Sequence, residues 1–313
     1  MAENRNAQQV REITDKLEQG LKELFESERF KEYLKTMSKF YNYSFNNTLL
    51  IAMQKPDATL IAGYTAWQRN FDRHVMKGEK GIKILAPAPY KVQEEREKLD
   101  PATQKPVLDK DGKPVTETVE VTRPAFKVVS VFDVSQTDGK ELPDIAVDEL
   151  TGSVENYAAF FDALKELSPV PIAFENITDG AKGYFSHVEN RIAIQEGMSE
   201  IQTIKTAIHE IAHAKLHAVT PGEKVAPEDK KDRRTKEVEA ESVAYTVCQR
   251  YGIETSDYSF GYIAGWSSDK ETKELKGSLE TIRKTAAEMI TGIDEKLKER
   301  LSVKEQEAPT PLR

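Results

Sequence analysis

Apolar residues near the start of the chain recur at helical spacing, which predicts an amphipathic helix that runs to about Lys35. The apolar positions of this helix are Val10, Ile13, Leu17, Leu21, Leu24 and Phe25. A short apolar helix is expected over residues 49–53, and it should end at Pro56 because proline cannot continue a helix. A further helix is predicted over residues 64–71. The chain is therefore expected to begin with three helical segments.

Two apolar stretches, residues 82–85 and 126–132, are predicted strands. Between them, residues 91–124 are highly charged and contain a turn sequence and a partly alternating segment, which indicates a solvated hairpin insertion. Turn-forming residues break the pattern over residues 136–150. We therefore expect a first domain of α+β type over residues 1–140.

The second half of the chain is predicted to be mostly helical, with a small antiparallel sheet. The predicted elements are a helix over 154–167, a strand over 171–174, a β-hairpin over 182–194 and helices near 199–218, 233–251 and 276–301. They define a second domain over residues 150–301, and the proline-containing residues 302–313 are expected to be a disordered tail. The predicted fold class is α+β, with two domains.

Composition narrows the class of protein. The chain has 313 residues, of which 38% are hydrophobic and 31% charged, and this is typical of a soluble protein of two domains. No apolar run approaches the roughly 20 residues that span a bilayer, and the first residues lack a secretory signal pattern. The single cysteine, Cys248, excludes an internal disulfide and is expected to be buried. We expect a cytoplasmic protein that does not associate with membranes.

The sequence His-Glu-Ile-Ala-His at residues 209–213 lies in the second domain. His209 and His213 are four residues apart on a predicted helix, so both imidazoles project from one side and can bind one tetrahedral zinc ion. Glu210 lies beside the first histidine. It can take a proton from a zinc-bound water and pass it to a leaving amine. The pattern indicates a site of the zinc metallopeptidase type, with one zinc ion per chain.

A catalytic zinc ion needs a third protein ligand, and the next predicted helix offers Glu237 and Glu241. We assign Glu237 as the ligand and Glu241 as the carboxylate that orients a ligand histidine, with the reverse assignment left open. Glu239 should point away and face solvent.

Two further histidines are weaker candidates for the metal site. His217 follows on the same helical face but lies one turn too far to be an easy ligand. His187 lies on the predicted hairpin and is expected to be structural or to face substrate. Residues 183–194 are expected to supply an edge strand that pairs with an extended substrate.

The sequence resembles two known families. The second half is similar to the zincin domains of the ImmA/IrrE metallopeptidases and of ArdC-like antirestriction proteins, through residues 209–213 and 237–244. The first half resembles the ArdC N-terminal domain through residues 43–50, 63–67, 75–82 and 131–134. The insertion at 91–124 departs from the compact family pattern. The resemblance implies single-stranded DNA binding by the first domain.

The residues offer separate support for DNA binding. Residues 64–83 carry five basic and two acidic side chains, a local charge of +3 against −8 for the whole chain. Aromatic side chains interleaved with cations suit single-stranded DNA. The candidate DNA-binding residues are Tyr64, Arg69, Arg73, Lys77, Lys80 and Lys83. The alternative is that Trp67 and Phe71, which are one turn apart, are core residues.

Three functions fit these patterns. The first is a single-stranded DNA-binding protein of a plasmid or other mobile element with a zinc metallopeptidase-type domain, which protects incoming DNA from restriction as the ArdC resemblance implies. The second is a regulatory protease that cleaves a repressor, with a first domain that binds protein. The third is a DNA-binding protein with a purely structural zinc ion, which Glu210 disfavours because such an ion needs no general base.

Overall fold

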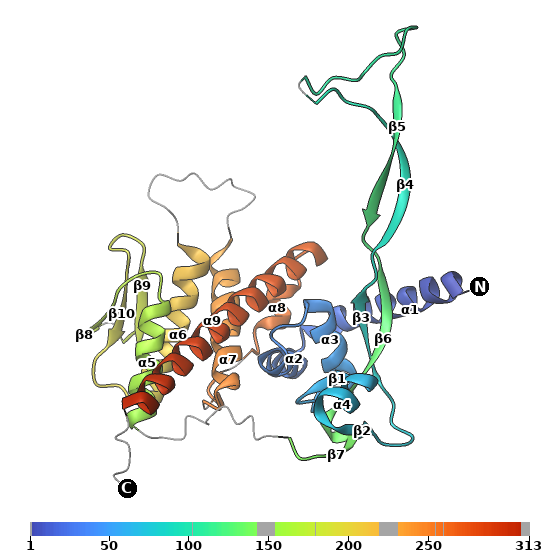
Figure 1. Ribbon diagram of the computed structural model, residues 1–313. Coiled ribbons are helices and arrows are strands. Elements are labelled where there is room, and N and C mark those ends of the chain that lie inside the picture. The colour runs from blue at the N-terminus through green and yellow to red at the C-terminus, as the bar shows by residue number, and fades with distance from the viewer. Residues whose placement is uncertain are drawn as a thin grey trace.

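The computed structural model describes residues 2–101, 103–142, 154–178, 180–218, 231–253, 255–258 and 260–307. The first half contains, in chain order, α1 (Ala2–Leu24), α2 (Ser27–Lys39), α3 (Phe45–Gln54), β1 (Ile61–Gly63), α4 (Tyr64–Phe71), β2 (Arg73–Val75), β3 (Ile82–Pro87), β4 (Tyr90–Glu97), β5 (Thr116–Arg123), β6 (Phe126–Asp133), η1 (Val134–Gln136) and β7 (Thr137–Gly139). The second half contains α5 (Val154–Leu167), β8 (Ile172–Glu175), β9 (Gly183–Ser186), β10 (Arg191–Gln195), α6 (Glu200–His217), α7 (Arg233–Arg250), α8 (Ile263–Ser267) and α9 (Thr272–Glu307). Figure 1 shows helices and small sheets in both halves, and the predicted α+β fold class is confirmed.

The first predicted helix is two helices, because the chain turns between α1 and α2. Phe25 and Phe30 are five residues apart, and on one continuous helix they would point in different directions. The turn lets both side chains be buried, Phe25 at 5% and Phe30 at 0% exposure. The helical spacing of the sequence did not reveal this break.

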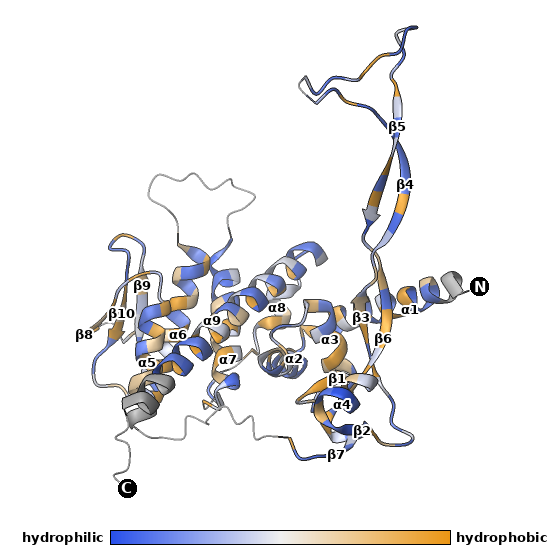
Figure 2. Ribbon diagram, in the orientation of Figure 1, coloured by the Kyte–Doolittle hydropathy of each residue, from blue (hydrophilic) through white to orange (hydrophobic). Residues whose placement is uncertain are grey.

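The first half contains a three-stranded antiparallel sheet in the order β1-β6-β3. β4 and β5 continue beyond β3 and β6 as an antiparallel hairpin made of the charged insertion. Figure 1 shows this hairpin as a long arm that projects away from the rest of the molecule, and Figure 2 shows blue, hydrophilic stretches along it. The sequence did not predict β1, β2 or β7, which have only three residues each, and β2 pairs with β7.

The sheet of the second half has the order β8-β10-β9. The predicted hairpin forms β9 and β10, whereas β8 runs parallel to β10, so this small sheet is mixed rather than purely antiparallel. β10 is the central strand, and its residues Ile192, Ala193 and Ile194 are fully buried. Their burial matches the orange, hydrophobic colour of β10 in Figure 2. Helix α6 packs against β9 and β10, which places the strand pair beside the histidines.

The end of the chain differs from its prediction. α9 begins at Thr272 and continues to Glu307, so the expected disorder from residue 302 is wrong for residues 302–307, and residues 308–313 lie outside the described part. The prolines behind this expectation, Pro309 and Pro311, lie after residue 307, and residues 302–307 are rich in lysine, glutamate and glutamine, which are good helix formers. The five-residue helix α8 was also not predicted. Among the described helices, none combines the length and apolar character that a bilayer crossing needs.

The largest hydrophobic core contains residues of both halves. α2 packs against α7, the ring of Phe30 lies 5.2 Å from that of Phe260, and the ring of Phe25 lies 5.8 Å from that of Trp266. Removal of either half would therefore expose a large apolar surface to water. The boundary predicted between residues 140 and 150 falls partly on residues 143–153, which lie outside the described part.

Asp133, at the end of β6, ties three segments of the first half together. Its buried carboxylate accepts hydrogen bonds from the backbone of Thr59 (2.7 Å) and Leu60 (3.1 Å) and from the hydroxyl of Ser135 (2.6 Å). Burial alone would raise the pKa of Asp133, but these hydrogen bonds outweigh burial and hold the pKa below its ordinary value. The ionised carboxylate therefore stabilises the fold.

We expect Asp133→Ala to lower the free energy of unfolding by about 2–3 kcal/mol, because it leaves several buried donors without an acceptor. The folded-state pKa is lowered, so the stabilisation is complete above the ordinary aspartate pKa of about 4 and is lost as pH falls through the lower folded-state pKa. Urea unfolding at pH 7 and at about pH 2.5 measures both effects. Asp138→Ala, which removes an exposed aspartate of β7, is the control and should change stability little. An equal loss at both pH values would contradict a charge-dependent role.

Candidate metal centre

Helix α6 carries both histidines of the motif. The hydroxyl of Ser199 caps its first turn by accepting a hydrogen bond from the backbone of Gln202 (3.3 Å). Ile208 and Ile211 are fully buried and fix which side of the helix faces the core. The histidines then lie on a common side, with the Nε2 atoms of His209 and His213 3.1 Å apart. Two nitrogen donors therefore point toward one position.

Helix α7 brings a carboxylate to the same position. Oε2 of Glu237 lies 3.5 Å from Nε2 of His213 and 3.7 Å from Nε2 of His209. Ligands about 2.0–2.1 Å from a tetrahedral zinc ion are about 3.3–3.4 Å apart, so the three separations suit such an ion. The two imidazoles hold the pKa of Glu237 far below its ordinary value, so it is ionised as a ligand must be. Within the described residues, the three candidate ligands His209, His213 and Glu237 form the group whose donor atoms could hold a metal ion.

The side chain of Glu210 projects from α6 and lies beside the edge strand β9. It is 8% exposed and accepts a hydrogen bond from the backbone N–H of Phe185. Burial raises the pKa of Glu210, although the nearby His209 and His213 oppose this effect. A carboxylate with a raised pKa accepts protons more readily, as a general base must.

Gly183 allows β9 to approach this close to α6. A Cβ atom at this position would lie 2.6 Å from the methyl group of Thr206 and 2.9 Å from the carbonyl oxygen of Ala193. Any other residue would push the strand away from Glu210, whose Cγ would be only 3.4 Å from that Cβ. The edge of β9 is thus held beside the candidate ligands.

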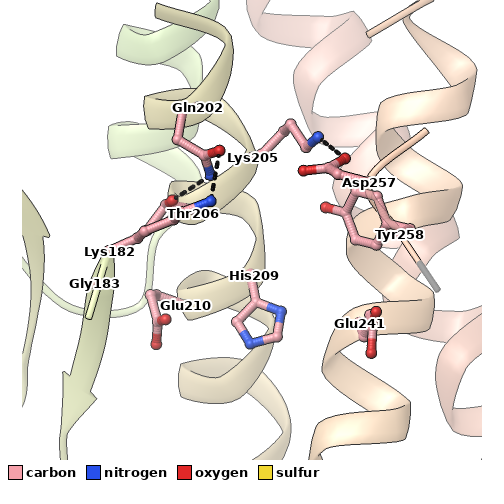
Figure 3. Close-up of a pocket in the computed structure, with 10 residues that line it drawn as sticks. All are labelled: Lys182, Gly183, Gln202, Lys205, Thr206, His209, Glu210, Glu241, Asp257 and Tyr258. Carbon is pink, nitrogen blue, oxygen red and sulfur yellow. Dashed lines mark hydrogen bonds and ion pairs between the residues drawn. The ribbon is translucent and has the colours of Figure 1, made fainter. Parts of the chain in front are cut away.

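Two adjoining cavities of about 350 and 530 Å³ flank the centre and share Gly183, His209 and Glu210. Figure 3 shows the smaller one, with Glu210 on the side of the strand and His209 on the side of Glu241. An ion pair between Lys205 and Asp257 lies at one end of this cavity. The larger cavity includes His187, for which a structural role and a role toward substrate both stay predictions. A peptide therefore has room on both sides of Glu210.

Glu241 is placed one turn after Glu237, but its partner is unexpected. It accepts a hydrogen bond from the hydroxyl of Tyr262, and in the described part of the chain no hydrogen bond joins it to a histidine. Tyr262 was not found by sequence reasoning, because nothing in its spacing relates it to the motif. The orienting role of Glu241 stays a prediction.

Glu239 does not face solvent, and this expectation is wrong. Its side chain is fully buried and accepts a hydrogen bond from Nε2 of His217 (3.1 Å), while both its oxygens lie 2.7 Å from Nζ of Lys231. α7 contacts α6, α9 and α2, so the face opposite Glu237 is covered by other helices. The other ring nitrogen of His217, Nδ1, lies 3.0 Å from Nδ1 of His213. The four-residue spacing from His213 was a signal that His217 belongs to the site.

The aromatic residues of the candidate DNA surface have different environments. Trp67 is fully buried and its indole donates a hydrogen bond to the carbonyl of Phe132 (2.9 Å), so the core interpretation is confirmed for this residue. Phe71 packs on Trp67 with ring centroids 4.9 Å apart. Tyr64 is 52% exposed and touches Phe132 only edge-on. Tyr64 therefore remains the aromatic side chain of this segment that could stack on a base.

Two of the basic candidates are engaged within the protein. Arg73 donates to Thr137 (2.8 Å) and to the carbonyl of Lys140 (2.6 Å), and it joins β2 to β7. Lys83 donates to the hydroxyl of Ser130 (2.5 Å) across the β3–β6 pair. Arg73 therefore has a structural role that its position in the sequence did not indicate.

Arg69, Lys77 and Lys80 are exposed. Lys77 and Lys80 flank a turn at Gly78, whose φ of +93° requires glycine. In Figure 1, α4 and β2 lie on the opposite side of the molecule from β8, β9 and β10. The candidate DNA contacts are thus remote from the candidate metal centre.

An HExxH helix, a following helix that carries a glutamate, and an edge strand beside the first helix together define the zincin class. Comparison with known proteins agrees with this class of site. Residues 4–132 match the family of the N-terminal domain of anti-restriction factor ArdC, and residues 168–252 match the IrrE N-terminal-like domain of the M78 peptidases. The resemblance expected from the sequence is confirmed: the chain joins an ArdC-type N-terminal domain to an IrrE-type metallopeptidase-like domain.

The chain is similar to several individual proteins. It is 29% identical over 328 residues to the uncharacterized protein pXO2-81 of Bacillus anthracis, a match that covers 93% of this chain and 52% of that protein. It is 34% identical over 148 residues to the DNA primase TraC of Escherichia coli, covering 44% of this chain and 12% of the primase. The chain therefore spans about half or less of the length of these relatives. The metal-free crystal structure of antirestriction protein ArdC from plasmid R388 matches with 21% identity and a TM-score of 0.47, covering 82% of this chain and 84% of that one.

We expect Glu237→Ala to reduce bound zinc more than Glu241→Ala, because the first variant removes a ligand atom and the second at most misorients one. Metal content after zinc loading and dialysis, measured by mass spectrometry of the full chain, gives the comparison. His209→Ala and His213→Ala should also lose the metal. A larger loss in Glu241→Ala than in Glu237→Ala would transfer the ligand role to Glu241.

Proposed function

We propose that this chain is a single-stranded DNA-binding antirestriction protein of a mobile element, with a zinc metallopeptidase-type site in its second half. The observation that carries the proposal is the convergence of His209, His213 and Glu237 beside Glu210, in a chain whose residues 4–132 match the ArdC N-terminal domain. The match to the ArdC N-terminal domain family and the similarity to a DNA primase support a DNA partner.

The donor set favours one zinc ion per chain. Two imidazole nitrogens and one carboxylate suit zinc, and the remaining position of a tetrahedral site is left to water or substrate. Zinc bound there would polarise a substrate carbonyl and lower the pKa of a water molecule. Glu210, buried and hydrogen-bonded by the backbone of Phe185, would accept a proton and return it to the leaving amine.

The edge of β9 offers a place for an extended peptide. β9 pairs with β10 on one side, and its other side faces α6 and the two cavities. A peptide that adds to this edge would pass Glu210 and present its backbone to the candidate metal centre. The rival function, a regulatory protease that cleaves a repressor, uses the same groove and differs in the partner of the first half.

We expect Glu210→Gln to retain zinc and to lose at least about a hundredfold in cleavage of unfolded casein, because it removes only the proton acceptor. Zinc content and fluorescence of labelled casein measure the two effects. The same variant tested for protection of incoming plasmid DNA in a restricting host shows whether protection needs this carboxylate. Loss of zinc in Glu210→Gln would contradict its role as a base, since a base is not a ligand.

We expect the full chain to bind single-stranded DNA more tightly than duplex DNA, with an affinity that falls steeply with salt. Lys77→Ala with Lys80→Ala should reduce the slope of log affinity against log salt by about one unit per lost phosphate contact. Lys284→Ala with Lys298→Ala, two exposed lysines of α9, makes the same charge change elsewhere and is the control. Fluorescence anisotropy with a labelled oligonucleotide measures the slopes.

Tyr64→Ala should weaken binding by about 1–3 kcal/mol without changing the salt slope, because stacking releases no counterions. Its half-exposed ring should make it tolerable to the fold, which a melting curve checks. Equal affinity for single and double strands at low salt would favour the repressor-cleaving protease instead.

A further inference from the structure

A buried chain of side chains leads away from the candidate metal centre. From His213 it passes to His217, then to Glu239 and finally to Lys231, with successive separations of 3.0, 3.1 and 2.7 Å. The side chains of His217 and Glu239 are 2% and 0% exposed. Ser278 of α9 also hydrogen-bonds Glu239. Three helices therefore meet at a buried carboxylate, whose partner Lys231 is 36% exposed.

Stability alone does not explain why the carboxylate of Glu239 is buried. Desolvation of an ion pair cancels most of its Coulombic attraction, and apolar residues of similar volume stabilise a protein at least as well. Glu239 and Lys231 form such a pair, which is tied through His217 to a candidate metal ligand. The arrangement extends the carboxylate–histidine–zinc motif by one imidazole.

With Glu239 ionised and His217 neutral, the hydrogen bonds of the chain assign one proton to each imidazole. An ionised carboxylate only accepts hydrogen bonds, so Nε2 of His217 must carry a proton. A neutral imidazole carries one proton, which leaves Nδ1 of His217 as an acceptor. Its partner at 3.0 Å is Nδ1 of His213, which must then be the donor. Nε2 of His213 is then unprotonated, and this is the atom that faces His209 and Glu237.

We propose that Glu239 and His217 are positioning residues of the metal centre, which hold His213 in the tautomer and ring orientation in which Nε2 can bind the metal. Lys231 neutralises the buried carboxylate and keeps it ionised. The proposal rests on the metal centre of the proposed function. It adds Glu239, on the face of α7 opposite to Glu237, together with His217 of α6 and Lys231, which precedes α7.

Zinc affinity of the full chain, measured by competition with a chromogenic chelator, tests the proposal. Glu239→Gln and His217→Leu should each bind zinc about 10–100-fold more weakly, the range seen when a group that orients a metal ligand is lost. His217→Gln should recover most of the affinity, because one amide can accept from His213 and donate to Glu239. A merely space-filling role would favour leucine over glutamine. Glu288→Gln, which alters an exposed carboxylate paired with Lys215 on the far side of α6, is the control and should bind as the wild type does.

The outcomes separate the two proposals. If the wild type binds no zinc, the metal centre itself fails. If the wild type binds zinc and folded Glu239→Gln and His217→Leu bind it equally well, only the positioning role is overturned. Should both variants fail to fold, nitrogen-15 spectra of the zinc-loaded wild type decide. Protonated Nδ1 of His213 and protonated Nε2 of His217 support the proposal, and the opposite tautomers overturn it.

Discussion

Close packing of α6 against α7 is the contact on which the candidate metal centre depends. Both helices carry small, fully buried residues: Ala207 and Ala212 on α6, and Ala240 and Ala244 on α7. Small side chains let two helices approach closely, and larger ones would separate them. Glu237 reaches the histidines only because of this approach, since a shift of one ångström would break the separations that suit a metal ion. Gly183 allows β9 a similarly close approach to α6, beside Glu210.

The same core links the two halves of the molecule. α7, which carries Glu237, also packs against α2, and the aromatic pair of Phe30 and Phe260 lies in that region. The ArdC-type match ends at residue 132, yet its first helices cover helices of the IrrE-type part. A change in the first half can therefore reach the metal centre through packing. The candidate DNA surface near α4 lies far from the centre, so any communication between them must pass through this core.

The sequence predicted the elements whose signal is local. Helical spacing gave α5 with its bounds and placed α6 and α7 within one or two residues, because a helix with a buried face repeats its apolar positions every three or four residues. The HExxH spacing brought His209 and His213 together without knowledge of the fold, since four residues make about one helical turn. The short strands β1, β2 and β7 and the helix α8 were not predicted, because so few residues show too little of any repeat. The break between α1 and α2 was not predicted, because apolar residues recur at helical spacing in both helices.

By itself, then, the sequence determined the fold class, the family resemblance and the two histidines with Glu210, all of which rest on residues close together in the chain. Only the tertiary structure decided which residues from elsewhere join them. It brought Glu237 to the histidines and buried Glu239, which helical geometry alone had turned toward solvent. In the tertiary structure Trp67 is buried and Arg73 binds β7 through Thr137. Tyr64, Lys77 and Lys80 stay exposed. The physical reason is that the side of a helix facing solvent depends on how many other elements pack around it, and α7 is covered on more than one side.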